Sequence, residues 1–471
     1  MAGVSGARKV GATALLATVL FSAPLAAQDI VTKEYDNGGI YEGTFKNGLQ
    51  HGHGTYRLPN GYEYSGDWVE GAILGQGKVR YPNGSTYEGA FVGGLPHGKG
   101  RIVYPDGRTY DGDWVNGEII GQGVATYPNG TSYTGGFDHA LHQGKGRMES
   151  TEGYVYDGDW VQGVKEGQGH ITYPDGSVYE GGMLADKRAG QGKLTYADGR
   201  IYEGAWAGGV IAGQGKLTLA NGDVYEGTFA NNRLQGKGSF RSAEGFVYEG
   251  DWVKGRMEGT GTSTYPDGIR YEGSFAENLA HGRGKITYPD GTDYDGDWVS
   301  GVIEGEGIAH YANGLVYEGG FRSGRSNGKG TITYPGGYTY AGDWVEGRRE
   351  GLGEAKYPDG STYTGAFVDG QREGEGEIVM ADGYRYKGQW HAGKIEGTGV
   401  ATYATGDVYE GSFKDGKPDG QGTMRYASGE VAAGGWTDGT LTEPAPEAPA
   451  PTEGEPAAAE PAPEPSTGTS N

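Results

Sequence analysis

Charged residues recur along the chain at spacings that could support chemistry. Acidic side chains return at one place in a regular pattern: Glu42, Glu88, Asp111, Asp157, Glu180 and Glu203. Lysines return at two other places: Lys78, Lys99, Lys193 and Lys237. If these rows face each other across neighbouring strands, they form ion pairs on a solvated surface. The alternative is a ladder of carboxylates that binds cations or catalyses a reaction.

Two motifs could hold a metal ion. His51 and His53 are separated by one residue, which puts both imidazoles on one face of a strand. The other histidines are scattered along the chain. Turns such as Pro105-Asp106-Gly107 each offer one carboxylate, where a calcium site needs several oxygen ligands. We therefore predict no metal site.

Two glycine motifs resemble catalytic or cofactor-binding signatures as strings. Gly-x-Gly recurs regularly, but no Gly-Lys-Ser/Thr and no helical pattern follows it, so it does not predict a phosphate loop. Gly324-Arg325-Ser326-Asn327-Gly328 matches the nucleophile elbow of hydrolases without the strand, turn and helix that an elbow requires. We predict no catalytic residue and no cofactor-binding residue.

The elements that would position these residues are set by a repeat of 23 residues, which starts at Tyr41 and runs without insertion to Ala432. We number each of its eighteen copies from the leading Tyr at position 0. Gly recurs at positions 2, 11, 13 and 20, and an aromatic residue at position 4, where Met183 is an exception. These four positions hold 69 of the 97 glycines, so most of the glycine content is part of the repeat architecture.

Each repeat predicts a β-hairpin. Polar and large residues alternate over positions 0 to 4 and again over positions 11 to 17, which is the period of a strand. Pro-Asp-Gly at positions 18 to 20 and Asn-Gly near positions 6 and 7 predict the turns. We expect the rings to lie over the glycines on one face, with the tyrosine hydroxyls in water at the edge of a thin core.

Phe and Trp alternate at position 4, so the full unit is a pair of repeats with 46 residues. All nine Trp occupy this position, and Asp precedes six of them. Amplification of a two-repeat unit and a requirement of paired packing both explain the alternation.

The pattern resembles the MORN repeat, whose consensus is Tyr-Glu-Gly-x-Trp/Phe-x-x-Gly, then Gly-x-Gly, then Tyr-Pro-Asp-Gly. The resemblance covers residues 41–442. It implies an all-β fold, an elongated and twisted single-layer antiparallel β-meander similar to a solenoid. It also implies roles in protein assembly, dimerisation or association with membrane lipid. MORN arrays are often attached to catalytic domains, and we expect no such domain in this sequence.

The two ends differ from the repeats. Residues 1–27 are typical of a bacterial signal peptide, with Arg8 and Lys9 before a short apolar run; an uncleaved membrane anchor is the alternative. Residues 28–40 are expected to form a lead-in or N-terminal cap. Residues 443–471 are rich in Pro, Ala and Glu, which predicts a disordered acidic tail. We therefore expect an exported protein of the periplasm, cell envelope or cell exterior.

The net charge of −23 argues against binding of nucleic acid and against strong attraction to anionic lipid headgroups. Sequence varies most at positions 5 to 10, as in 72–74, 118–120, 210–212, 348–350 and 371–373, so we expect loops there to carry any specificity. We predict a non-enzymatic scaffold that binds envelope proteins. The alternative is direct binding of membrane lipid or envelope glycan through the aromatic face or groove. Edge strands are also compatible with a homodimer.

Overall fold

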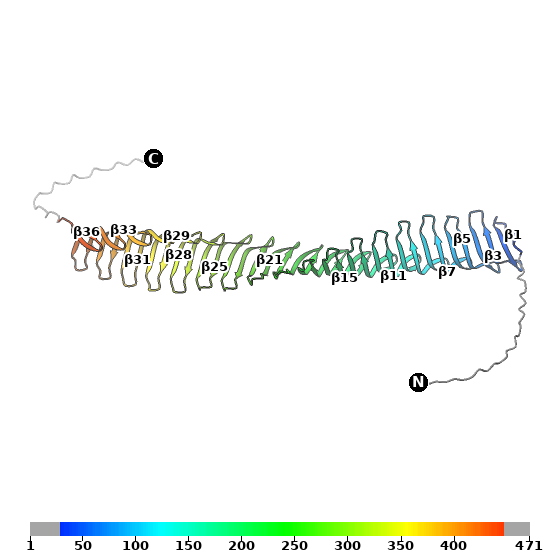
Figure 1. Ribbon diagram of the computed structural model, residues 1–471, viewed down its shortest axis with the longest axis horizontal. Coiled ribbons are helices and arrows are strands. Elements are labelled where there is room, and N and C mark those ends of the chain that lie inside the picture. The colour runs from blue at the N-terminus through cyan, green and yellow to red at the C-terminus, as the bar shows by residue number, and fades with distance from the viewer. Residues whose placement is uncertain (1–28, 447–471) are drawn as a thin grey trace, which may run out of the picture. The chain divides into compact units, whose positions relative to one another are not determined.

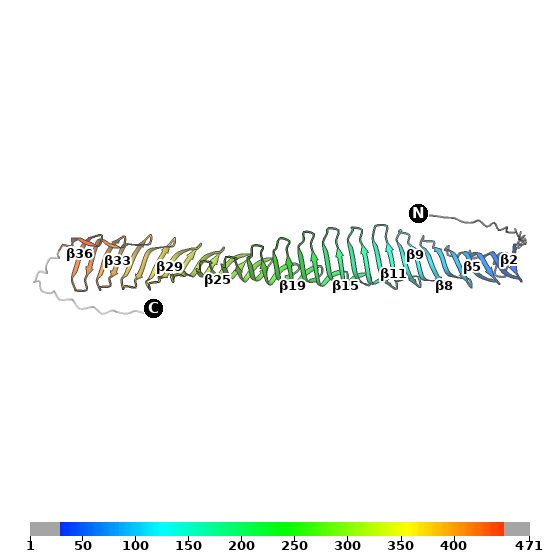
Figure 2. The ribbon, with the colours of Figure 1, turned by 60° about the horizontal axis from the view of Figure 1, so that its bottom comes forward.

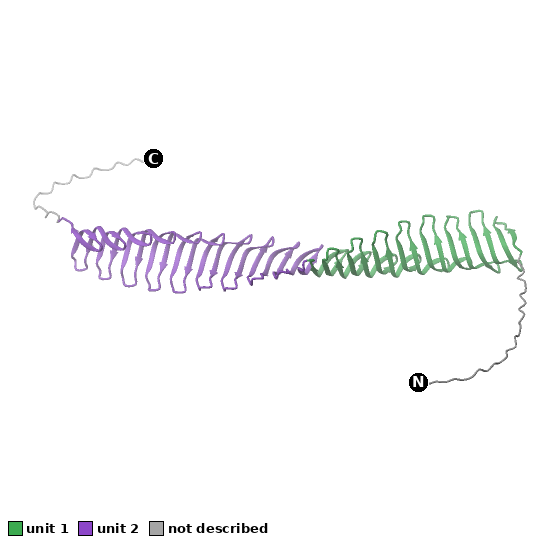
Figure 3. Cartoon of the chain, in the orientation of Figure 1, with its two compact units in different colours: residues 1–220 green, residues 221–471 purple. Residues whose placement is uncertain are grey.

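A computed structural model describes residues 29–446, and all the regular elements in this range are β-strands. The chain divides into two compact units, residues 1–220 and 221–471 (Figure 3). Within each unit, consecutive strands pair antiparallel in chain order and turn gradually, as in a twisted sheet (Figure 1, Figure 2). The described residues contain no helix that could span a membrane.

The strands of the first unit are β1 Val31–Glu34, β2 Ile40–Lys46, β3 Leu49–Arg57, β4 Glu63–Val69, β5 Ala72–Arg80, β6 Thr86–Val92, β7 Leu95–Val103, β8 Thr109–Val115, β9 Glu118–Thr126, β10 Ser132–Asp138, β11 Leu141–Glu149, β12 Val155–Val161, β13 Val164–Thr172, β14 Val178–Leu184, β15 Lys187–Thr195, β16 Ile201–Ala207 and β17 Val210–Thr218.

The strands of the second unit are β18 Val224–Ala230, β19 Arg233–Arg241, β20 Val247–Val253, β21 Arg256–Thr264, β22 Arg270–Ala276, β23 Leu279–Thr287, β24 Asp293–Val299, β25 Val302–His310, β26 Val316–Arg322, β27 Arg325–Thr333, β28 Thr339–Val345, β29 Arg348–Lys356, β30 Thr362–Val368, β31 Gln371–Val379, β32 Arg385–His391, β33 Lys394–Thr402, β34 Val408–Lys414, β35 Lys417–Arg425, β36 Val431–Thr437 and β37 Thr440–Pro444.

Each repeat folds into the predicted hairpin, and β12 with β13 is representative. Gln162 and Gly163, at positions 6 and 7, both have positive φ, which closes a two-residue turn of type I′. The second strand begins at position 8, whereas the sequence predicted a start at position 11. Gly167 at position 11 is a bulge with φ of 109°, and it interrupts the pairing between the two strands. The prediction of a loop over positions 5 to 10 is therefore wrong for position 5, which ends the first strand, and for positions 8 to 10, and only positions 6 and 7 form the turn.

The register brings two glycines opposite each other, and in most repeats the tyrosine at position 0 lies on this pair; Tyr225 is an exception and packs on Phe240 instead. Gly158 pairs with Gly169 inside the hairpin, and Gly169 pairs with Gly181 of the next repeat. The ring of Tyr156 lies on this pair, because a Cβ added to Gly169 would stand 2.4 Å from Tyr156 Cε2. The expected arrangement of rings over glycines is thus confirmed.

The tyrosine hydroxyl at position 0 is not in water, which corrects the sequence-based expectation. Tyr156 is 0% exposed, and its hydroxyl donates to the carbonyl of Asp159 at 2.7 Å. The same bond recurs from Tyr64 to Asp67 and from Tyr340 to Asp343. The hydroxyl therefore satisfies a main-chain carbonyl at the place where the bulge removes its partner in the sheet.

The aromatic residue at position 4 joins neighbouring repeats. Trp160 Nε1 donates to the carbonyl of Gly146 in the preceding repeat at 3.0 Å, and its ring meets Tyr133 edge-on at 5.3 Å. Phe137 makes the ring contact with Tyr110 at 4.9 Å. Phe has no N–H group to donate to the glycine carbonyl of the preceding repeat. The Trp repeat and the Phe repeat of a pair therefore contact their preceding repeats differently.

One strand is added outside the repeats at the N-terminal end of the described residues, where β1 pairs with β2. At the other end, β37 is the second strand of the last repeat and pairs with β36. The last strand ends at Pro444, two residues inside the segment 443–471 for which a disordered tail is predicted. The rest of that segment and the predicted signal peptide at 1–27 lie outside the described residues.

Candidate functional site

The acidic and basic rows face each other on the polar side of the sheet. Asp at position 3 meets the residue at position 12 of the preceding repeat, as Asp113 meets Lys99 at 2.7 Å and Asp343 meets Lys329 at 2.6 Å. Glu at position 1 meets position 14 in the same way, as Glu203 meets Lys193 at 3.1 Å. The lysine beside it lowers the pKa of Asp113 below its usual value. The rows are therefore solvated ion pairs, and each pair contributes little to stability.

Shallow grooves run between these pairs, with glycines as their floor. One groove of about 570 Å³ is lined by Lys78, Glu88, Gly89, Lys99 and Gly100. Among the described residues, no group of three or more His, Asp or Glu side chains could hold a metal ion. The groove has the ionic character of the surrounding face and no set of converging ligands.

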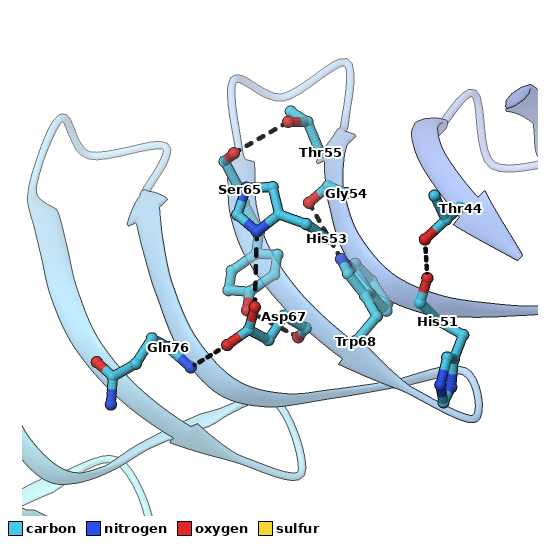
Figure 4. Close-up of polar contacts among 10 residues, drawn as sticks. Thr44, His51, His53, Gly54, Thr55, Ser65, Asp67, Trp68 and Gln76 are labelled. Atoms are coloured by element: carbon cyan, nitrogen blue, oxygen red, sulfur yellow. Dashed lines mark hydrogen bonds and ion pairs between the residues drawn. The ribbon is translucent and has the colours of Figure 1, made fainter. Parts of the chain in front are cut away.

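The aspartate at position 3 also accepts a hydrogen bond from a main-chain N–H group next to the bulge. Asp67 Oδ2 accepts a hydrogen bond from the main-chain N–H of Gln76 at 2.8 Å, while Trp68 Nε1 donates to the carbonyl of Gly54 at 3.2 Å (Figure 4). The same carboxylate stands 3.6 Å from His53 Nδ1. The aspartate that precedes Trp therefore has a structural role at the bulge.

His51 and His53 do not form the pair that their spacing suggested. Figure 4 shows the two rings apart, with His53 beside Asp67 and His51 beyond Thr44. Gly52 between them has φ of 79°, and this left-handed residue breaks the alternation of side chains along the strand. The expectation that both imidazoles share one face is wrong.

The segment from Gly324 to Gly328 is an ordinary turn and bulge of the repeat. Gly324 closes the hairpin between β26 and β27, and Ser326 pairs with Phe321 on the aromatic face. No helix follows it in the described part of the chain. The string therefore has none of the context of a nucleophile elbow.

Positions 8 to 10, which the sequence presents as freely variable, have three different environments. Position 9 lies on the rings, where Ile119 and Ile211 are buried. Position 10 often supports the next turn, because Glu373 Oε2 accepts from the N–H of Ala392 at 2.8 Å. Position 8 is exposed at the tip of the hairpin and pairs with position 5, as Leu95 pairs with Val92. The sequence alone did not lead us to separate the environments of positions 8, 9 and 10. The Glu and Gln residues that recur at position 10 are the feature that could have indicated the difference.

Charged side chains at position 9 pack on the rings of the aromatic face. Lys165 Nζ lies 5.6 Å from the ring of Trp160, and Arg188 lies 4.1 Å from the ring of Trp206. His142 stacks on Tyr133 at 3.7 Å and bonds to the hydroxyl of Tyr127 at 2.9 Å. Burial, together with the nearby charge of Lys165, lowers the pKa of His142 to about 4.

Exposed aliphatic residues follow the hairpin tips of the first unit. We call this set the tip stripe; its members are 39 to 58% exposed, and they are Leu49, Val69, Val92, Leu95, Val115, Leu141, Val161 and Leu184. Each leucine at position 8 lies beside the turn glycine of the next repeat. For example, a Cβ added to Gly163 would be in van der Waals contact with Leu141. In the second unit, the same two positions hold exposed aliphatic residues, among them Val253, Leu279, Val299, Val302, Val345 and Val368, and charged residues that form ion pairs, such as Arg256 with Glu277 and Lys394 with Asp415. The tip stripe is a row of exposed apolar side chains that charged residues at the same positions, such as Glu118, Asp138 and Lys187, interrupt.

Comparison with known proteins identifies the repeat. The MORN repeat model matches residues 41–61, 64–86, 87–107, 110–132, 156–178, 179–199, 202–224, 225–246, 248–270, 271–293, 294–316, 317–337, 340–362, 363–383, 386–408 and 409–431. These are sixteen of the eighteen registers. The register at 133 forms the same hairpin in the structure, whereas the one at 432 forms a hairpin with a different register, in which Gly434 pairs with Pro444.

Individual relatives share only parts of the chain. Alsin of Rattus norvegicus is 45% identical over 49 residues, which are 9% of this chain and 3% of alsin. The TCP domain of SAS-4 of Drosophila melanogaster, solved in complex with a proline-rich motif of Ana2, is 20% identical, with a TM-score of 0.23 over 33% of this chain and 85% of that chain. The TCP10 domain of Danio rerio CPAP, in complex with a peptide of STIL, is 15% identical, with a TM-score of 0.22 over 57% and 100%.

The sixteen matches together span most of the described residues, and the hairpin geometry follows the same consensus throughout. The chain belongs to the MORN repeat family.

Proposed function

We propose that this protein is a non-enzymatic scaffold that binds other proteins in a bacterial cell envelope. The observation that carries the proposal is the tip stripe. Its residues are exposed and apolar, they recur along one edge of the sheet, and they do not contribute to the ring core. Exposed apolar residues gathered on one part of a surface are typical of interaction sites. The proposal that the protein is exported rests on residues 1–27, whose sequence resembles a signal peptide.

The aromatic face gives weaker support for direct stacking on glycan. All nine Trp are only 2 to 6% exposed, so their faces are occupied by tyrosine edges and by residues at position 9. Tyrosines at position 17, such as Tyr265 with 43% exposure, are the accessible rings. Sugar stacking needs an open ring face, and for this reason we prefer proteins as partners.

Photo-crosslinking tests the proposal at a single residue. A photoreactive amino acid replaces Val92, which is 47% exposed in the tip stripe, or Val124, which is 41% exposed on the polar face. We expect protein adducts from position 92 in envelopes and few from position 124. Lipid adducts alone at position 92, or equal protein adducts from both positions, would contradict a protein-binding tip stripe.

A further inference from the structure

A row of tyrosines follows one edge of the sheet in the second unit. These tyrosines are at position 17, where the second strand of a hairpin has ended and the turn to the next repeat begins. We call this set the tyrosine row; its members are Tyr265, Tyr288, Tyr311, Tyr334 and Tyr357. Tyr265, Tyr311 and Tyr334 are 40 to 43% exposed, and the other two are half-buried. The tyrosine row is therefore open to a partner, unlike the buried rings of the core.

The sheet fixes the spacing of the tyrosine row. The N–H of Tyr288 donates to the carbonyl of Thr292 at 2.8 Å, and its carbonyl accepts from the turn glycine at 3.0 Å. The same two bonds close the turn at all five tyrosines. Since each repeat contributes two strands, successive tyrosines are about 9.6 Å apart along the sheet. Tyr338 lies between Tyr334 and Tyr357, with ring centroids 5.4 and 5.3 Å from theirs, in agreement with this spacing.

Several rings at position 17 of the first unit are engaged by the chain itself. Arg108 and Arg200 lie 4.9 and 4.5 Å from the ring of the tyrosine in their own turn. In contrast, Tyr288 and Tyr311 make no aromatic contact, no cation–π contact and no side-chain hydrogen bond within the described residues. Their ring edges and hydroxyl groups are therefore available to a ligand.

Gaps separate the rings of the tyrosine row where position 21, which lies between two successive tyrosines, is not aromatic. The first three intervals hold Ile269, Thr292 and Leu315 at this position. Tyr265, Ile269 and Tyr288 line a cleft of about 320 Å³, and Tyr265 is the most exposed ring in its wall. Gaps between aromatic rings of this kind accept the apolar ring of a proline.

Acidic side chains at position 19 lie in the turns beside the tyrosine row. Asp267 and Asp290 are exposed, and each carboxylate accepts from the main-chain N–H two residues further on. Neither forms an ion pair in the described part of the chain, whereas Asp106 in the first unit pairs with Arg108 at 2.7 Å. These turns therefore favour a basic ligand. The proline-rich residues 447–471 of the chain itself contain Glu and no Lys or Arg, so we look to a partner.

We propose that the tyrosine row binds a basic, proline-rich segment of a partner protein in the polyproline II conformation. This helix repeats every three residues, or about 9.3 Å, which matches the spacing of the tyrosines. A proline at every third residue packs between successive rings, and basic residues between the prolines face the turn aspartates. The tyrosine hydroxyls donate to carbonyls that the polyproline II helix leaves without internal partners. This inference rests on protein binding as the proposed function and names the class of segment bound.

The test uses a fluorescent peptide of five Pro-Pro-Arg repeats with the full mature chain, and binding is followed by fluorescence anisotropy. A peptide of five Ala-Ala-Arg repeats has the same charge and is the matched control. We expect the proline peptide to bind at least about tenfold more tightly than the alanine peptide. Equal affinities would mean attraction by charge alone and would overturn the proposal.

A peptide with the repeat Pro-Pro-Arg-Ala tests the spacing, because its period is four residues in place of three. We expect it to bind at least about threefold more weakly than the peptide of Pro-Pro-Arg repeats, since its prolines lose register with the rings. Equal affinity of these two peptides would reject the match between helix and sheet, and with it the proposal.

Tyr288→Leu combined with Tyr311→Leu removes two rings of the tyrosine row. Leu58 occupies position 17 in another repeat, so this variant should fold, and its melting temperature verifies this. We expect it to bind the proline peptide at least about tenfold more weakly than the wild type. Tyr104→Leu is the matched control and should bind like the wild type, because Arg108 covers this ring. Equal affinity of the double variant and the wild type would overturn the proposal.

Competition identifies the occupant. A synthetic peptide of residues 447–471 should not displace the proline peptide, because its charge repels the turn aspartates. Displacement would make the chain's own segment the occupant and would contradict the proposal. Displacement by an oligosaccharide of N-acetylglucosamine would assign the tyrosine row to glycan, which also contradicts it. These measurements use the purified chain, so photo-crosslinking at position 92 still tests the tip stripe if they fail.

Discussion

The tyrosine at position 0 connects three features at the scale of a single residue. Its ring fills the space left by two paired glycines, its edge contacts the aromatic residues of two repeats, and its hydroxyl satisfies a carbonyl beside the bulge. Tyr156 illustrates all three through Gly169, Trp160 and Asp159. The ring and the glycines require each other, because neither a larger residue at position 13 nor a smaller one at position 0 would preserve the contact.

Gly169→Ala tests this dependence. The added Cβ would meet Tyr156 at 2.4 Å, so the ring or the strand must move. We expect the free energy of unfolding to fall by about 1–3 kcal/mol, measured by thermal or urea denaturation. Gly336→Ala is the matched control, because a Cβ there meets nothing within 4 Å. A similar loss in both variants would show that glycine flexibility, rather than ring packing, explains the pattern.

Trp160→Ala and Trp252→Ala test whether the tryptophans are core residues. Both are less than 5% exposed, and each indole donates to a glycine carbonyl of the preceding repeat at 3.0 Å. We expect each variant to lose about 3–5 kcal/mol of stability and to melt at lower temperature. Unchanged melting with weakened binding to envelopes would instead identify the tryptophans as a binding row.

The buried His142 makes stability depend on pH. Its pKa is about 4 in the folded chain and 6.5 in the unfolded chain, so the unfolded state binds the proton more readily. Stability should therefore fall as the pH drops from about 6.5 to about 4, by roughly 2–3 kcal/mol. Urea denaturation at several pH values measures this change.

His142→Leu is the control for this titration, since Leu234 occupies the same repeat position. The variant should lack the loss of stability between pH 6.5 and 4 that is specific to His142, while carboxylates continue to titrate in both proteins. Parallel pH profiles for the two chains would be inconsistent with a neutral buried imidazole.

At the scale of the element, the hairpin is defined by its two left-handed turn residues and its bulge. Where Gly is absent at position 7, the residue still takes positive φ, with 61° at Ala140 and 63° at Asp186. Alanine is strained in this region, whereas Asn tolerates it better and glycine adopts it freely. The turn geometry is therefore imposed by the neighbouring hairpins.

Ala140→Gly should relieve this strain. We expect the free energy of unfolding to rise by about 0.5–1 kcal/mol in urea denaturation, although glycine usually destabilises a folded chain. Ala276→Gly, in the extended strand β22, is the matched control and should lower stability. A loss of stability in both variants would mean that the backbone at Ala140 is not strained.

Much of the hairpin could be predicted from sequence, because Gly, Tyr and Pro-Asp-Gly act locally. The ring face, the turns and the antiparallel order follow from alternation and turn chemistry. The second strand was predicted to begin too late, because a glycine bulge at position 11 breaks the alternation that marks a strand. For the same reason, His51 and His53 were placed on one face.

At the scale of the whole molecule, a uniform frame carries side chains that vary along the hairpin tips. Exposed aliphatic residues follow the tips of both units, and ion pairs such as Arg348 with Asp369 and Lys394 with Asp415 join neighbouring tips in the second. Each group of tips is formed by a few repeats and their immediate neighbours. A substitution in one group should therefore leave the others intact, because each repeat contacts mainly the next.

Co-sedimentation of the mature chain with bacterial envelopes, untreated or stripped by protease, tests the central claim most directly. The wild type is compared with a variant that replaces Val69, Val92, Val115 and Val161 by Thr, and with Val124→Thr as the control. We predict that the wild type and the control sediment with untreated envelopes only, and that the tip-stripe variant stays in solution. Equal sedimentation with stripped envelopes, or sedimentation of the tip-stripe variant at the level of the wild type, would contradict a scaffold that binds proteins through this surface.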